Sequence, residues 1–68
     1  MAEGKVKWFS STKGYGFIQP NDGSGDVFVH VTAIEKAGIK NLNEGQVVAY
    51  ELVTERGKTA ASDIRLLD

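Results

Sequence analysis

Hydrophobic and polar residues alternate along most of this chain, in short stretches that are separated by turn-forming residues. A repeat of two is typical of strands that bury one face. The alternation predicts strands at residues 6–9, 15–19, 26–30, 47–54 and 59–66. Between the second and third strands, the stretch rich in Asn, Asp and Gly at 20–25 is the strongest turn signal in the sequence. The pattern therefore predicts an all-β domain.

The second predicted strand separates its aromatic residues from its aliphatic residue. Tyr15 and Phe17 share one face of the strand, and Gly16 and Ile18 share the other. Ile18 is the better candidate for the core, because the glycine beside it lets another backbone approach closely. Two rings are then left facing water, which predicts a ligand that covers them. The neighbouring Lys13 favours an anionic ligand.

The third predicted strand repeats this arrangement. Val27 and Val29 point to one face, and Asp26, Phe28 and His30 point to the other. If the second and third strands pair in antiparallel fashion, their rings lie on one shared surface.

The first predicted strand breaks the alternation at two adjacent aromatic residues. Val6 and Lys7 point to opposite faces, but a flat strand cannot bury both Trp8 and Phe9. A bulge or bend, or a second exposed ring, resolves the conflict. Trp8 is expected on the outer surface with the other rings, and Phe9 is expected to support it in part.

The alternation is absent from residues 31–45. About one helical turn is predicted at 32–37, with Thr32 as its N-cap and Ile34 as a core residue. The remainder is expected to form a surface loop anchored by Leu42.

The last two predicted strands form a hairpin around the charged turn at 55–58. The first of them alternates Val48, Tyr50 and Leu52 against Ala49 and Glu51. In the second, the residues available for the core are Ala61, Ile64 and Leu66. Five short strands with one long connection after the third suit a closed five-stranded antiparallel barrel, which leaves no strand edge exposed. An open barrel of the SH3 type fits the number of strands almost as well.

The composition restricts the chemistry of the protein. The chain has 68 residues, which predicts one domain over 1–68. It has no Cys and one His, so neither a disulfide nor a zinc site is expected, and no cofactor is predicted. Without paired carboxylates or an activated nucleophile, the protein is predicted not to be an enzyme. No apolar stretch is long enough for a signal peptide or a membrane span, so a cytoplasmic location is expected.

The charges are balanced in number but unevenly distributed. Eight Lys and Arg residues oppose nine Asp and Glu residues, which gives a formal net charge of −1. This balance argues against a general binder of polyanions. Lys5, Lys7 and Lys13 nevertheless cluster near the start of the chain, with only Glu3 opposing them. A local basic surface is therefore expected without a basic isoelectric point.

Two stretches carry a resemblance to a known family. They are similar to the two ribonucleoprotein motifs of the cold-shock domain family, namely Lys13-Gly14-Tyr15-Gly16-Phe17-Ile18 and Val27-Phe28-Val29-His30. The resemblance covers essentially the whole chain, and its further matches are Gly4-Lys5-Val6-Lys7-Trp8-Phe9, Asp26, Ala33-Ile34 and Glu44-Gly45-Gln46. It implies a five-stranded OB-fold barrel that binds single-stranded RNA and DNA. It also implies an RNA chaperone, acting in some members as a transcription antiterminator, that works as a monomer and prefers pyrimidine-rich strands.

The chain departs from the family pattern at four places. Val31 and Ile39 stand where family members usually carry aromatic residues. Ser10 replaces a common Asn, and Lys58 follows Gly57 where Pro is frequent. The same binding mode is therefore expected with fewer stacked bases at the end of the site near Val31 and Ile39.

The predicted nucleic-acid-binding residues combine rings, cations and one carboxylate. They are Lys7, Trp8, Lys13, Tyr15, Phe17, Asp26, Phe28, His30 and Arg56. The rings are expected to stack on bases and the cations to contact phosphates. Asp26 is expected either to accept hydrogen bonds from base amino groups or to cap the turn before its strand. The rival function is an SH3-like domain whose exposed rings grip a proline-rich peptide.

Overall fold

Five strands and one short helix make up the regular structure of the computed structural model, which describes residues 2–67 apart from the side chain of Glu55. In chain order the elements are β1 (Ala2–Ser10), β2 (Tyr15–Pro20), β3 (Val27–His30), α1 (Val31–Lys36), β4 (Val47–Glu55) and β5 (Lys58–Leu66). All five strands match stretches predicted from the alternation. No helix within residues 2–67 is long and apolar enough to cross a membrane.

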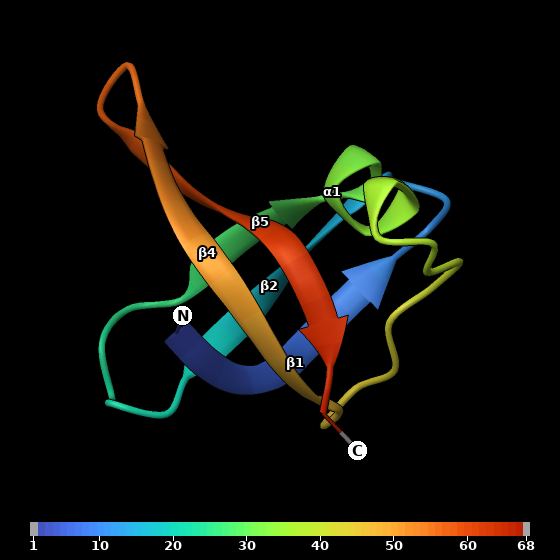
Figure 1. Cartoon of the computed structure of the whole chain (residues 1–68), viewed down its shortest axis with the longest axis horizontal. Coiled ribbons are helices and arrows are strands. Elements are labelled where there is room, and N and C mark those ends of the chain that lie inside the picture. The colour runs from blue at the N-terminus through green and yellow to red at the C-terminus, as the bar shows by residue number, and fades with distance from the viewer. Residues whose placement is uncertain (1, 68) are drawn as a thin grey trace.

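The strands form a closed barrel in the order β1-β2-β3-β5-β4, in which β4 pairs back to β1. Figure 1 shows the sheet curling around its core, with α1 at one end and the β4–β5 hairpin reaching beyond the barrel. The all-β barrel predicted from the sequence is confirmed. One pairing differs from the expectation, because β3 and β5 are parallel and meet at Phe28 and Ala60. A ring with an odd number of strands cannot alternate in direction throughout, so one parallel pair is unavoidable.

The core contains the aliphatic residues that the alternation turned inward. Ile18, Val29, Ile34, Val48 and Tyr50 are fully buried. They pack in one cluster whose other buried members are Val6, Val27, Leu42, Ala61 and Ile64. Burying such side chains stabilises the fold by roughly 1.5–3 kcal/mol each. The inward faces of β2 and β3 are therefore as predicted.

Leu66, which was available for the core, and Leu52, which was predicted to share a face with Val48 and Tyr50, are both exposed. Leu52 is 54% exposed and Leu66 is 43% exposed. A register shift between Ala49 and Glu51 interrupts the alternation in β4, so that Ala49 is buried next to Tyr50. Leu52 then lies where β4 has left its pairing with β1, and Leu66 is the last residue of β5.

The helix α1 begins one residue earlier than the sequence indicated. His30, not Thr32, is its N-cap, because the Nδ1 atom of His30 accepts a hydrogen bond from the backbone N–H of Thr32 at 3.2 Å. Ile34 is the buried residue of the helix, as predicted. The helix ends at Lys36 with Ala37 as its C-cap, and the next residue, Gly38, adopts a φ of 78°.

Gly16 lies where the backbone of β2 closely approaches that of β1. A Cβ atom at this position would lie 2.6 Å from the Cα of Phe9 and would also collide with the backbone oxygen of Trp8. Real Cβ atoms do not come so close to backbone atoms, so β1 and β2 can pair at this distance only with a glycine at position 16.

Candidate nucleic-acid interface

A bulge in β1 turns Trp8 outward. Val6 pairs with Ile18 and Trp8 pairs with Phe17, so Lys7 is the extra residue between them. Trp8 consequently lies on the outer face with Phe17. Phe9 pairs with Gly16 on the inner face and packs against the core, so Phe9 is not part of the outer surface.

The rings of β1, β2 and β3 come together through cross-strand pairs. Phe17 lies opposite Phe28, and Tyr15 lies opposite His30. The structure therefore brings five of the predicted site residues into one group. We call this group the aromatic surface, and its members are Trp8, Tyr15, Phe17, Phe28 and His30.

Neighbouring rings of the aromatic surface are in contact. The distances between their ring centroids range from 5.4 Å, for Trp8 and Phe17, to 6.4 Å, for Tyr15 and Phe17. Phe17 meets both Tyr15 and Phe28 edge to face, and only Tyr15 and Phe28 are near parallel, at 27°. Edge-to-face contacts hold aromatic rings in place without stacking them on each other. The surface is thus preorganised, and its rings remain partly exposed.

An ion pair borders the aromatic surface. The Nζ atom of Lys7 lies 2.9 Å from a carboxylate oxygen of Asp26, and both side chains are partly exposed. The pair joins the bulge of β1 to the residue before β3. Neither role expected for Asp26 included this contact, because the contact depends on the register of three strands. An exposed ion pair contributes little to stability, so Lys7 can exchange Asp26 for another anion at small cost.

The other two predicted cations lie in turns. Lys13 precedes β2, and its backbone N–H donates to the Oγ atom of Ser10 at 3.2 Å. Arg56 lies in the turn of the β4–β5 hairpin, where Arg56 and Gly57 have φ angles of 53° and 77°. Within residues 2–67, neither side chain makes a hydrogen bond or salt bridge to a described side chain.

A groove of about 570 Å³ continues from the aromatic surface toward the hairpin. Phe28 forms one wall, and the remaining lining is Val53, Lys58, Thr59 and Ala60. Of these, only Phe28 was predicted as a site residue. The others lie beside it because β3 and β5 are neighbours, which the alternation does not reveal. A basic residue in a predicted hairpin turn was the only available signal for Lys58.

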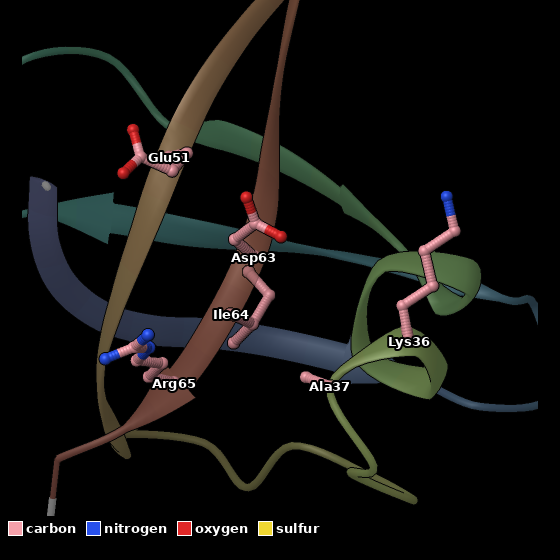
Figure 2. A pocket seen from close by; sticks show the side chains of 6 residues that line it. All are labelled: Lys36, Ala37, Glu51, Asp63, Ile64 and Arg65. Carbon is pink, nitrogen blue, oxygen red and sulfur yellow. The ribbon is translucent and has the colours of Figure 1, made fainter.

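A second groove, of about 320 Å³, lies between α1 and the β4–β5 pair. Figure 2 shows Lys36 on α1 across from Asp63 on β5, with Glu51 and Arg65 on the strands. This groove contains no aromatic residue and none of the predicted site residues, so it is separate from the aromatic surface.

Comparison with known proteins decides the family. The family model described as the 'cold-shock' DNA-binding domain matches residues 2–67. The chain belongs to the cold-shock domain family. Cold shock protein CspA of Rhizobium meliloti is 57% identical over 67 residues, which cover 96% of this chain and 97% of the relative. Cold shock protein CspB of Geobacillus stearothermophilus is 55% identical, covering 97% and 100%, and cold shock-like protein CspE of Escherichia coli is 52% identical, covering 94% of each.

The two positions at which this cold-shock domain has an aliphatic residue in place of the usual aromatic one lie close together. Val31 and Ile39 line one groove of about 430 Å³, with Glu35, Gly38 and Lys40. The backbone N–H of Val31 donates to the Gly14 oxygen at 2.9 Å, which holds position 31 beside the turn that carries Lys13. The groove therefore begins next to the end of the aromatic surface formed by Tyr15 and His30.

Val31→Phe is expected to tighten the binding of this cold-shock domain to a single-stranded oligonucleotide. A ring at position 31 adds a stacking surface next to His30, and one stacked base contributes roughly 1–3 kcal/mol. Fluorescence titration of the two proteins measures the change. Leu66→Phe, which adds a ring at an exposed position on β5, is the matched control. Equal affinities of Val31→Phe and the unmodified protein would place position 31 outside the site.

Proposed function

We propose that this cold-shock domain binds single-stranded RNA and DNA by stacking bases on the aromatic surface, and that it acts as an RNA chaperone. One observation carries the proposal: rings from three strands lie in contact on one outer face, beside Lys7 and Lys13. Unpaired bases present flat faces of the same kind, whatever their sequence.

Each part of the surface has a distinct role in this proposal. Trp8, Phe17 and Phe28 each take a base, with Tyr15 and His30 extending the row. Lys7 leaves Asp26 to contact a phosphate, and Lys13 and Arg56 supply further phosphate contacts. The Asp26 carboxylate then accepts hydrogen bonds from the Watson–Crick edge of a base. The family resemblance supports a preference for pyrimidine-rich strands.

Chaperoning follows from binding alone. A duplex hides its base faces, so a protein that binds only the open strand shifts the pairing equilibrium toward melting. No catalytic step and no fuel are required. We further propose that the protein acts as a monomer in the cytoplasm, where RNA folds as it is transcribed, and that antitermination is one outcome of this melting.

A short single-stranded oligonucleotide is expected to quench the fluorescence of Trp8. Stacking places a base against the indole ring, and roughly three phosphate contacts give a slope of about −2 for the logarithm of affinity against the logarithm of salt concentration. Titrations of a thymine-rich strand at several salt concentrations measure both effects.

A matched duplex and a proline-rich peptide are the controls for this titration. Neither is expected to quench Trp8, because the duplex hides its bases and the peptide carries none. Absence of quenching by any single strand at low salt would overturn the nucleic-acid proposal, and quenching by the peptide would favour the SH3-like alternative.

A further inference from the structure

A pocket of about 330 Å³ lies away from the aromatic surface, where the β2–β3 connection meets the start of β1 and the middle of β4. Its polar lining includes Glu3, Asn21 and Asp22, and its apolar lining includes Pro20 and Leu52. It shares no residue with the aromatic surface or with the grooves around it. The pocket is therefore separate from the proposed nucleic-acid interface.

Tyr50 forms the inner wall of this pocket. Its side chain is fully buried, and its hydroxyl has no hydrogen-bond partner among the side chains and backbone that the structure describes. A buried hydroxyl without a partner is unfavourable, and such groups are rare in folded proteins. Burial and then the nearby Asp22 carboxylate raise the pKa of Tyr50. Tyr50 and Asp22 both line the pocket.

The pocket carries negative charge and no lining cation. Hydrogen bonds from the Oγ and backbone N–H of Ser24 hold the pKa of Asp22 below its ordinary value, so Asp22 is ionised at neutral pH. Glu3 supplies a second carboxylate, and Leu52, which is 54% exposed, supplies an apolar wall. Two carboxylates are fewer than the roughly six oxygen ligands that a calcium ion takes. The lining therefore suits an organic cation with a short apolar chain.

We propose that this pocket binds the protonated amine of a short aliphatic chain. The ammonium group donates hydrogen bonds to Asp22, Glu3 and the Tyr50 hydroxyl, and its methylene groups lie against Pro20 and Leu52. A free diamine and a lysine side chain of another protein both present this group.

Residues of the β2–β3 connection line the pocket together with Tyr50. Few backbone hydrogen bonds hold the connection: the Asn21 N–H donates to the Glu3 oxygen at 3.0 Å, and the Gly23 N–H donates to the Pro20 oxygen at 3.3 Å. Gly23 and Gly25 have open space around them. Because the hydroxyl is buried, the proposal requires this segment to move and uncover the hydroxyl as the amine enters.

The test is an NMR titration of the ¹⁵N-labelled protein without nucleic acid. The probes are 1,4-diaminobutane and a blocked Gly-Lys-Gly peptide, with n-butanol and sodium chloride at matched ionic strength as controls. Saturable shifts are expected at the backbone amides of Asn21, Asp22 and Leu52 with either amine but with neither control. The probe that binds more tightly identifies the source of the amine.

Tyr50→Phe and Asp22→Asn are the test variants. Each removes one hydrogen-bond partner of the ammonium group, and Asp22→Asn is expected to weaken amine binding roughly tenfold. Tyr50→Phe is expected to weaken it several-fold while leaving the fold at least as stable, because it removes an unpaired buried hydroxyl. Glu44→Gln, which removes a carboxylate outside the pocket, is the matched control. Equal binding by all variants, or equal shifts with n-butanol, would overturn the proposal.

Discussion

Phe17→Ala is expected to weaken the binding of a single-stranded oligonucleotide by roughly tenfold to a hundredfold, as the loss of one stacked base would give. Phe17 lies at the centre of the aromatic surface, with ring centroids 5.4 Å from Trp8 and 5.9 Å from Phe28. Because its ring is only half-buried, we expect a loss of stability of about 1 kcal/mol, well below that of a core Phe. Fluorescence titration and urea unfolding measure the two effects.

Phe28→Ala is expected to behave in the same way, and neither variant should open a labelled RNA hairpin, as we expect the unmodified protein to do. Leu66→Ala is the matched control, because Leu66 is an exposed apolar residue outside the site. If the two Phe variants unfolded while still binding in proportion to their folded fraction, the rings would be core residues and the proposed interface would be wrong.

Gly16→Ala is expected to lower the free energy of unfolding by roughly 3 kcal/mol, through a steric clash that backbone atoms cannot relieve. The added Cβ would meet the backbone of Trp8 and Phe9. A domain of this size has about 3–5 kcal/mol of stability from its core, so the variant keeps about 0–2 kcal/mol and up to half of its molecules should be unfolded at room temperature. Urea unfolding followed by circular dichroism measures the change.

Gly25→Ala is the control for this prediction, since a Cβ at Gly25 meets nothing within 4 Å. The two variants make the same chemical change in different surroundings. Cooperative unfolding of Gly16→Ala at the urea midpoint of the unmodified protein would mean that β1 can move away from β2 without breaking the bulge.

The sequence predicted the aromatic surface well because the surface depends on local information. In β2 and β3, each ring alternates with an aliphatic residue, so the faces of Phe17 and Phe28 follow from the residues next to them. To predict that Trp8 faces outward, only a bulge in β1 had to be assumed, and the two adjacent aromatic residues already indicated one.

The predictions that failed depend on distant parts of the chain. Leu52 was placed on one face with Val48 and Tyr50, because alternation does not reveal where β4 shifts register or leaves its pairing with β1. The pairing of Lys7 with Asp26 and the placement of Lys58 beside Phe28 both require the order of strands in the ring. Spacing within one strand carries no information about that order.

The parallel contact between β3 and β5 gives Phe28 a second role, in the pairing of strands. Phe28 pairs with Ala60 where β3 meets β5 in the barrel, and its side-chain ring also belongs to the aromatic surface. Local separation of β3 from β5 would therefore move a residue that we expect to hold a base. By linkage, a single-stranded nucleic acid that binds only the barrel with β3 and β5 paired must lower the fraction of molecules in which the two β-strands are separated. The pairing of β3 with β5 and the binding of nucleic acid to the aromatic surface are then two coupled equilibria, and Phe28 takes part in both.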